Sequence, residues 1–312
     1  MRIPRVIVLT ALAGLTGCGQ SGTSSSGVGG AKPIQVDGSS TVFRISKAAQ
    51  EGFAAQDDSI QVIVGNHGTG GGFGAYLRGE VDIVDASRAA KPEEEAEAKS
   101  KGLEWQRFLV GYDGITVVVN PKNDFVKSLS VAQLKTLWEP GSKATTWKDL
   151  DPSWPGRKIV LYCPDNDSGT FEFFTEAIVG KAKKQRQDVQ ASADDNTLVS
   201  GVAGEPDGLG YFGYAYFAAN ASRLRAVPIR KDDKAEPVLP SPETILSKSY
   251  APLSRPLYIY VKKSALKRPE VAKFVRYYIV NGADLAKQGG YVAPTEADRT
   301  ANAEALKGLG VP

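Results

Sequence analysis

The stretch IQVDGSSTVFRISKAAQEGFAAQ, residues 34–56, contains the pattern from which the fold is predicted. Residues 34–36 alternate apolar and polar side chains, which predicts a short strand. Apolar residues then recur three and four positions apart, which predicts an amphipathic helix. Between them lies Gly38-Ser39-Ser40-Thr41. The free N–H groups of a first helical turn and the helix dipole favour an anion, and the hydroxyls add donors, so this unit is suited to holding an anion.

Three further stretches repeat this chemistry, each after a predicted strand: Gly68-Thr69-Gly70-Gly71-Gly72, Ala86-Ser87-Arg88 and Asp167-Ser168-Gly169-Thr170. Glycine lets the backbone approach a ligand closely. One such stretch alone would usually be no more than a helix N-cap. Four in one chain, one with an arginine and one with a carboxylate, predict a site that surrounds a small tetrahedral oxyanion.

The N-terminal residues have the features of an export signal. Two arginines precede an apolar run over residues 6–15, which is too short to span a membrane. Leu15-Thr16-Gly17-Cys18 resembles the bacterial lipobox, where the chain is cut before the cysteine and its thiol takes a lipid. We therefore expect a signal peptide over residues 1–17 and a lipidated Cys18 with a flexible tether over residues 18–32. The alternative is an uncleaved anchor with a chance cysteine.

This N-terminus predicts an extracytoplasmic protein, in the periplasm or at the cell surface, that is attached to a membrane only through its lipid. The sequence beyond the tether is long enough for two ordinary domains or one large one, and it contains no run near the roughly 20 apolar residues of a membrane span. With Cys18 lipidated, Cys163 has no partner for an intramolecular disulfide, and we expect it to be a small packed residue.

The charge balance excludes some classes of partner. The formal charge of +3 falls to +1 when the two arginines of the signal peptide are removed. Such a balance argues against nucleic-acid binding and against long-range attraction of anions by net charge. The capture of an anion would have to be local.

Strands and helices alternate along the chain, which predicts an α/β fold with mostly parallel sheets. In such sheets ligands gather at the carboxyl ends of strands, where the four motifs lie. Three motifs fall within about 55 residues and the fourth about 80 residues later, so we expect two lobes with the ligand between them. Residues 114–120 and 257–261 are the predicted crossover strands. The other predicted strands cover residues 34–36, 60–64, 81–84 and 158–162, and helices include 91–101, 131–138, 169–178, 195–202 and 242–246.

Nearly the whole mature sequence resembles the phosphate-binding proteins (PstS family) of the phosphate ABC importer, above all their shorter, cyanobacterial-type members. The resemblance rests on the four motifs and on three more: Gly111-Tyr112-Asp113-Gly114-Ile115, Leu209-Gly210-Tyr211-Phe212-Gly213-Tyr214 and Pro252-Leu253-Ser254-Arg255-Pro256-Leu257. It implies a type II periplasmic-binding-protein fold with two α/β lobes. We place one lobe at residues 33–115 and 258–312 and the other at residues 116–257.

The resemblance further implies a monomer that captures inorganic phosphate and delivers it to the permease and ATPase subunits of an ABC importer. It implies neither an enzyme nor a cofactor or metal. Carried over position by position, it implies a phosphate site made of Ser40, Thr41, Val42, Thr69, Arg88, Ser168, Gly169 and Thr170, with Gly70 as a further candidate. Arg88 would be the bidentate cation, a role that suits its planar guanidinium.

Two departures from better-studied relatives concern charge. Those relatives have an aspartate where this chain has Arg88, and an arginine shortly before Ser-Gly-Thr where this chain has only Pro164-Asp165-Asn166-Asp167. The charge pair is therefore predicted to be exchanged between the lobes, with Asp167 as the first choice for the carboxylate and Asp85 as the second. Either could instead be a helix cap or an ion-pair partner of Arg88. Arg44 replaces a proline, and we expect it on the surface.

A carboxylate in the site would explain how phosphate is selected. Near neutral pH phosphate keeps at least one proton and can donate a hydrogen bond to an ionised carboxylate, whereas sulfate cannot. An unpaired and repelled acceptor discriminates strongly against a near-isostere.

Three alternatives stay open from the residues alone. The first is a phosphate-ester hydrolase, although His67 is the only histidine and the chain has neither a Gly-x-Ser-x-Gly elbow nor a cysteine and histidine metal cluster. For His67, a structural or surface role is favoured over a ligand contact. The second is a binding protein for another oxyanion, such as sulfate or molybdate, and the third is a lipid-anchored scaffold without a ligand.

Overall fold

The computed structural model describes residues 32–311. The predicted signal peptide over residues 1–17, the predicted lipidation of Cys18 and all of the predicted tether except residue 32 lie outside this range. Among the residues that the structure describes, no helix has both the length and the apolar character needed to cross a membrane.

The strands of residues 32–311 form one mixed sheet of nine strands and a small two-stranded sheet. The strands are β1 (Ile34–Gly38), β2 (Val62–Val64), β3 (Ile83–Ala86), β4 (Trp105–Val119), β5 (Leu129–Ser130), β6 (Val160–Pro164), β7 (Gln190–Ser192), β8 (Gly208–Gly213), β9 (Arg225–Ala226), β10 (Ile229–Arg230) and β11 (Ser254–Lys262). The large sheet has the order β2-β1-β3-β11-β4-β8-β6-β7, with β9 paired to β4, and β5 pairs with β10.

The helices connect these strands and cover the sheet. They are α1 (Ser40–Ala54), α2 (Thr69–Leu77), α3 (Pro92–Ser100), α4 (Val131–Trp138), α5 (Gly169–Phe174), α6 (Asp195–Gly204), α7 (Tyr214–Ala219), α8 (Pro242–Leu246), α9 (Pro269–Val280), α10 (Gly282–Gln288) and α11 (Glu296–Gly308). Three short helical segments are η1 (Trp147–Asp149), η2 (Thr175–Val179) and η3 (Ala265–Lys267), of which η2 is a π-helical continuation of α5.

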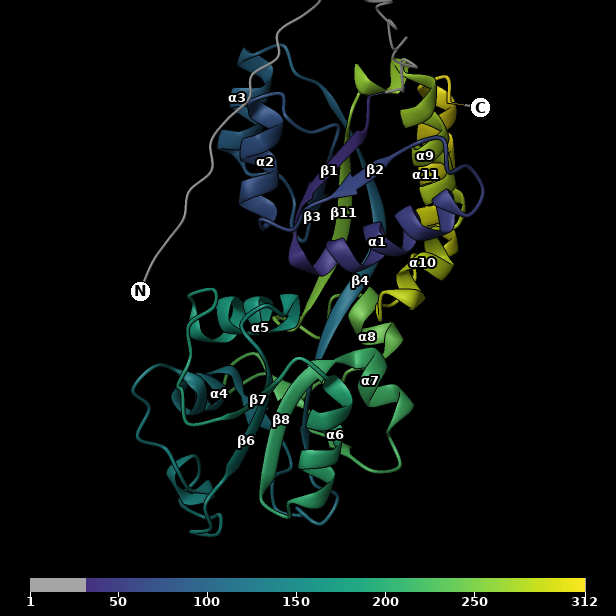
Figure 1. Ribbon diagram of the computed structural model, residues 1–312. Helices are drawn as coiled ribbons and strands as arrows, with labels where there is room; N and C mark the ends of the chain where they lie inside the picture. The colour runs from purple at the N-terminus through teal and green to yellow at the C-terminus, as the bar shows by residue number, and fades with distance from the viewer. Residues whose placement is uncertain (1–31, 312) are drawn as a thin grey trace, which may run out of the picture. The chain divides into compact units, whose positions relative to one another are not determined.

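Two long antiparallel strands connect two lobes. β1 is parallel to β2 and β3, and β6 is parallel to β7 and β8, whereas β4 and β11 are antiparallel to each other. Figure 1 shows β4 and β11 passing from the first lobe, which contains β1–β3, α1–α3 and α9–α11, to the second lobe, which contains β6–β8 and α4–α7. The partner of β4 changes from β11 to β8 between Gly114 and Ile115.

Each lobe is held together by apolar clusters on both faces of its part of the sheet. Along β4 the side chains alternate, so Val117 and Val119 join one cluster of the second lobe and Val118 joins the other. In the first lobe the buried face of α1 packs against β1 and α9, with Ile45 and Phe53 in this cluster. The predicted amphipathic pattern of α1 is confirmed.

The predicted α/β alternation is confirmed, but β4 and β8 depart from the expectation, and the short strands β5, β7, β9 and β10 were not predicted. The strand predicted at residues 114–120 is only the end of β4, which begins at Trp105. β8 was not predicted, because its three glycines dilute the strand pattern. Gly210 is needed there for close packing, since a Cβ atom on it would lie 3.0 Å from the carbonyl oxygen of Tyr162 on the neighbouring strand.

Candidate functional site

The starts of three helices meet at the carboxyl ends of the strands. The helices α1, α2 and α5 begin at Ser40, Thr69 and Gly169. Each of these residues lies within a motif, namely the first, the second and the fourth. A cavity of about 550 Å³, the interlobe cavity, lies beside them and is lined from both lobes. Its lining includes Thr69, Gly70, Ser87, Arg88, Glu172, Phe173, Glu176 and Arg255. The predicted site residues Ser40, Thr41, Val42, Ser168, Gly169 and Thr170 are not part of this lining. The position agrees with the rule that ligands bind beyond the carboxyl ends of strands.

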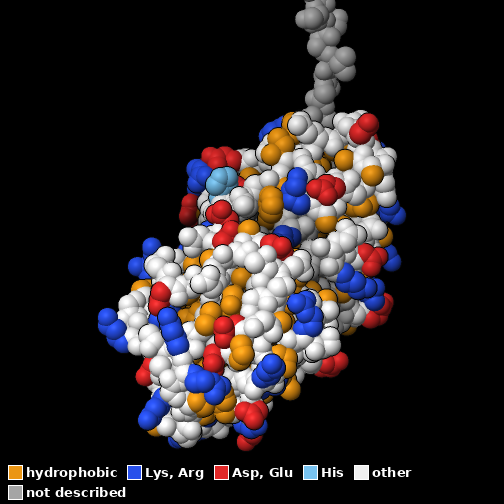
Figure 2. All heavy atoms as spheres, turned by 60° about the horizontal axis from the view of Figure 1, so that its bottom comes forward, with side chains coloured by type: hydrophobic (Ala, Val, Ile, Leu, Met, Phe, Trp, Pro, Cys, Tyr) orange, Lys and Arg blue, Asp and Glu red, His pale blue; other side chains and the backbone are white. Residues whose placement is uncertain are grey.

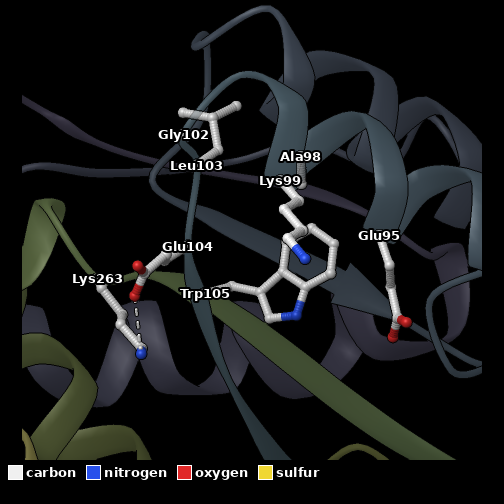
Figure 3. A pocket seen from close by; sticks show the side chains of 8 residues that line it. All are labelled: Glu95, Ala98, Lys99, Gly102, Leu103, Glu104, Trp105 and Lys263. Atoms are coloured by element: carbon white, nitrogen blue, oxygen red, sulfur yellow. Dashed lines mark hydrogen bonds and ion pairs between the residues drawn. The ribbon is translucent and has the colours of Figure 1, made fainter.

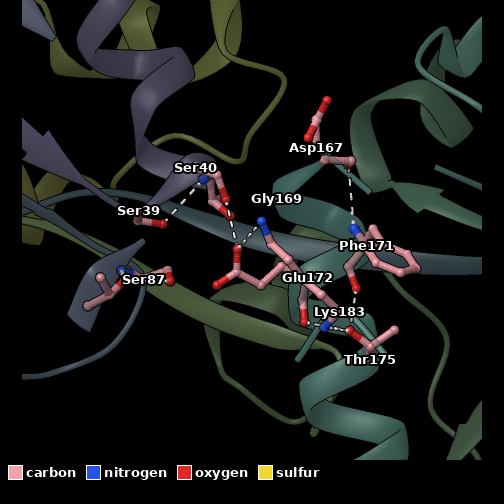
Figure 4. A network of polar contacts seen from close by, with 12 residues as sticks. Ser39, Ser40, Ser87, Asp167, Gly169, Phe171, Glu172, Thr175 and Lys183 are labelled. Carbon is pink, nitrogen blue, oxygen red and sulfur yellow. Dashed lines mark hydrogen bonds and ion pairs between the residues drawn. The ribbon is translucent and has the colours of Figure 1, made fainter. Parts of the chain in front are cut away.

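At the start of α1, the hydroxyls of the first motif have distinct partners. Ser39 is the N-cap, and its Oγ accepts a hydrogen bond from the Thr41 amide at 3.2 Å. Ser40 Oγ donates to Glu172 Oε2 at 3.2 Å, which connects the two lobes (Figure 4). Thr41 is buried, and the Val42 side chain lies in the core, so only the amide of Val42 is available for a polar role.

At the start of α2, the glycine-rich loop packs tightly on the end of β1. A Cβ atom on Gly72 would lie 2.7 Å from the carbonyl oxygen of Asp37, so no larger residue fits there. Thr69 Oγ1 accepts a hydrogen bond from the Ser87 amide and lies 3.2 Å from Ser87 Oγ. The second and third motifs therefore form one polar corner of the cavity.

At the start of α5, the second lobe touches the first. Ser168 is the N-cap, and its Oγ accepts hydrogen bonds from the amides of Thr170 and Phe171 at 3.2 and 3.4 Å. Gly169 lies against α1, because a Cβ atom there would be 2.5 Å from Thr41 Oγ1 and 2.7 Å from the Thr41 nitrogen. The N-terminal ends of α1 and α5 thus approach each other as closely as their backbones allow.

The cation beside these helix starts is Arg255 on β11, which sequence reasoning did not select. Its Nη2 donates to Thr41 Oγ1 at 2.7 Å, and its Nε donates to Asp113 Oδ2 at 3.3 Å. Its guanidinium carbon lies 3.7 Å from the ring centroid of Phe173. The Arg255 side chain is 13% exposed and that of Asp113 1% exposed, so this is a buried ion pair. Burial raises the pKa of Asp113, and the Arg255 guanidinium opposes that shift.

Arg88, the predicted cation, lines the interlobe cavity but is already paired. Its Nη1 and Nη2 donate to the two carboxylate oxygens of Glu94 at 2.9 and 2.8 Å, and its guanidinium carbon lies 5.5 Å from the centroid of the Phe73 ring. Hydrogen bonding to Glu94 raises the pKa of Arg88. Glu94 also accepts from the Lys91 amide at the start of α3, so it is held as a capping residue. The bidentate geometry expected of Arg88 is therefore used within the first lobe.

The structure does not bring Asp167, the first choice for the carboxylate, to the interlobe cavity. Asp167 is exposed on the turn before α5, where its amide donates to Asp165 Oδ1 at 3.2 Å. Figure 4 shows its carboxylate pointing away from Ser40 and Glu172. The physical reason is that Ser168, the next residue, already supplies the cap of α5.

Asp85, the second choice, is also absent from the cavity lining. It is fully buried beneath α1, and its Oδ1 accepts a hydrogen bond from Ser46 Oγ at 2.8 Å. Ser46 Oγ in turn lies 3.0 Å from the hydroxyl of Tyr278. Burial raises the pKa of Asp85 to about 8. Asp85 therefore belongs to the interior of the first lobe.

Asp85 leads to a prediction about stability and pH. Its pKa is raised from the ordinary 3.8 to about 8 in the folded chain, so its contribution to stability is present at acidic pH and is lost as the pH rises through this range. We therefore compare the free energy of unfolding of Asp85→Asn with that of the wild type at about pH 5 and at about pH 8. The difference should shift in favour of the variant at the higher pH. Urea denaturation at both pH values measures this. A difference between the two proteins that stays constant with pH would contradict it.

Other cavities of the described chain lack the motif residues. One of about 410 Å³ lies on the first lobe beside Trp105, where Lys263 Nζ lies 3.0 Å from Glu104 Oε2 (Figure 3). Another of about 450 Å³ contains Arg44 and Tyr216. Arg44, expected on the surface, is half-buried.

The charges on the face drawn in Figure 2 are mixed. Figure 2 shows basic and acidic side chains interspersed over the face in view, with no region of one sign. His67 is exposed at the rim of the interlobe cavity, where its Nδ1 lies 2.7 Å from Asp37 Oδ2. Among residues 32–311 no group of three or more histidine, cysteine, aspartate or glutamate side chains is arranged to hold a metal ion.

Comparisons with known proteins identify the family. The PBP superfamily domain matches residues 20–281. The chain is 41% identical to Protein SphX of Synechocystis, across 95% of this chain and 87% of that protein. It is 37% identical to the phosphate-binding protein PstS of Staphylococcus aureus, across 96% of this chain and 89% of that protein.

A solved structure extends the likeness to three dimensions. A possible phosphate-binding protein from Planctomyces limnophilus is 44% identical and superposes with a TM-score of 0.86, across 89% of this chain and 98% of that one. This chain therefore belongs to the PBP superfamily and, within it, to the family of two-lobed periplasmic phosphate-binding proteins that includes SphX and PstS.

Proposed function

We propose that this protein captures inorganic phosphate outside the cytoplasm and delivers it to the permease and ATPase subunits of an ABC importer. In this proposal a lipid on Cys18 holds the protein at a membrane surface, and the protein acts as a monomer by binding and release, without catalysis. The relatives named as phosphate-binding proteins support the ligand, and their similarity covers most of this chain.

One observation carries the proposal: helix starts from two lobes meet beside a buried guanidinium. Ser40 and Thr41 belong to the first lobe, Gly169 to the second, and Arg255 Nη2 lies 2.7 Å from Thr41 Oγ1. Backbone amides, hydroxyls and a guanidinium are the groups that bind a tetrahedral oxyanion without a metal. A site divided between lobes also lets the ligand favour the closed conformation.

We propose that the phosphate oxygens are shared among donors of both lobes. The proposed contacts are Ser40, Thr41, Val42, Thr69, Gly70, Ser168, Gly169 and Thr170, with Arg255 as the main cation and Arg88 at the edge of the site. The lobes would turn on β4 and β11, since these strands contain both predicted lobe boundaries. Another oxyanion such as sulfate or molybdate is the alternative ligand.

Calorimetry tests the ligand. We use the full chain with Cys18→Ser, which cannot take a lipid, and titrate it with phosphate, arsenate and sulfate in phosphate-free buffer. The expected result is one phosphate per chain, arsenate as a competing ligand and much weaker binding of sulfate. Equal affinity for phosphate and sulfate would reject the assignment to phosphate. Release of phosphate from an ester would instead favour the hydrolase.

A further inference from the structure

We propose that Glu172 is a built-in competitor of the ligand: its carboxylate holds Ser40 of the first lobe and keeps the lobes together until an oxyanion displaces it. The proposal rests on the phosphate-binding function argued above. It assigns a regulatory role to a residue that belongs to none of the four motifs.

The contacts of Glu172 place its carboxylate among the groups that would bind an anion. Its Oε2 accepts from Ser40 Oγ at 3.2 Å, and its Oε1 lies 3.9 Å from the position of a Cβ atom on Gly68, the N-cap of α2. Its side chain is 27% exposed and lines the interlobe cavity. Figure 4 shows the carboxylate beside Ser40, joined to it by a dashed line.

The charges around Glu172 explain why its carboxylate stays there. The first turns of α1 and α2 contain no acidic residue of their own. A carboxylate from elsewhere is therefore attracted to their positive ends. Lys183 Nζ forms an ion pair with Glu172 Oε2 at 3.7 Å, but Lys183 is about half exposed and belongs to the same lobe as Glu172. Ser40 is thus the partner that fixes the carboxylate across the lobes.

Two other hydroxyls of the proposed site are also engaged by protein groups. Thr41 Oγ1 accepts from Arg255, and Thr69 Oγ1 accepts from the Ser87 amide. The Ser40–Glu172 contact differs from these, because it is made between a hydroxyl of one lobe and a carboxylate of the other. Phosphate that takes the Ser40 hydroxyl must break this contact and meet a like charge. Glu172 therefore lowers affinity by stabilising a ligand-free closed form.

This mechanism predicts a uniform effect on anions. The protein must leave the ligand-free closed form before any anion can bind. The free energy of this step is the same for every ligand, so it lowers the apparent affinity of every ligand by the same factor. Removing the Glu172 charge should then strengthen binding of phosphate and sulfate equally, and the preference for phosphate should be unchanged. It should also open the protein in the absence of ligand.

The experiment compares Glu172→Gln with Glu176→Gln in the full chain carrying Cys18→Ser. Glu176 lines the same cavity and has the same charge, but within the described chain it makes no hydrogen bond to the first lobe. We expect Glu172→Gln to bind phosphate about tenfold more tightly, as the loss of one competing charge-assisted hydrogen bond implies. Glu176→Gln should change affinity by less. Calorimetry with phosphate and sulfate measures both.

Two binding results would overturn the proposal. One is unchanged or weaker phosphate binding in Glu172→Gln. The other is a selective gain for sulfate, which would make Glu172 the acceptor of the phosphate proton. Small-angle scattering without ligand gives a second readout that does not depend on the identity of the ligand. A larger radius of gyration for Glu172→Gln than for the wild type supports the contact between lobes even if phosphate is not the ligand, and an equal radius rejects it.

Discussion

Arg255→Ala is expected to lose both stability and phosphate binding. Removing the guanidinium leaves Asp113, which is 1% exposed, as a buried carboxylate without its partner. Breaking a buried pair in this way costs about 3–5 kcal/mol of the free energy of unfolding. If Arg255 also contacts phosphate through two N–H groups, affinity should fall by about a hundredfold. Urea denaturation and calorimetry measure the two effects separately.

A second variant separates the ion pair from the ligand contact. Replacing both charges, with Arg255→Met and Asp113→Leu, removes the unpaired carboxylate and should recover most of the lost stability. It should not recover phosphate binding. Arg88→Ala is the comparison for the other cation of the cavity. It should cost about 0–1 kcal/mol, because Arg88 is itself 30% exposed and Glu94 keeps the hydrogen bond from the Lys91 amide, and it should weaken binding by less than about tenfold.

If Arg88→Ala weakens phosphate binding more than Arg255→Ala does, Arg88 is the main cation of the site. A double variant that binds phosphate like the wild type would show that Arg255 only supports the fold. Such a result would leave the fold assignment intact, because that rests on the sheet and on the relatives.

The four motifs predicted where helices begin, because capping and close backbone approach are local properties of a sequence. Ser39 and Ser168 cap α1 and α5, and Gly72 lies where no Cβ atom fits. The alternation of strands and helices likewise predicted the parallel strands of each lobe. These parts of the fold could be foreseen from residues a few positions apart.

The partners of charged side chains could not be foreseen in this way. Arg255 pairs with Asp113, which is 142 residues away, and Glu172 binds Ser40 across 132 residues. Both pairs depend on how β4 and β11 bring the lobes together. One signal was present: Arg255 is a lone charge beside a strongly apolar strand, where an unpaired arginine would be costly. Asp113 stands in a similar position on β4.

Gly169→Ala is expected to prevent closure while leaving each lobe folded. The new Cβ atom would lie 2.7 Å from the backbone nitrogen of Thr41, and a backbone atom at the start of α1 cannot move aside without moving the helix. Alanine is otherwise a better helix former than glycine, so α5 itself should not be weakened. If phosphate is bound only when α1 and α5 meet, affinity should fall by about a hundredfold, and small-angle scattering should show no compaction when phosphate is added.

Gly204→Ala is the matched control, since Gly204 ends α6 in the same lobe and a Cβ atom there has no neighbour within 4 Å. It should bind phosphate and compact as the wild type does. The two variants make the same chemical change in the second lobe, so a difference between them isolates the contact with Thr41. Wild-type affinity in Gly169→Ala would mean that the lobes need not approach this closely around the ligand. The site would then be assembled by the side chains that reach across the cavity, with Arg255 foremost, rather than by the meeting of two helix starts.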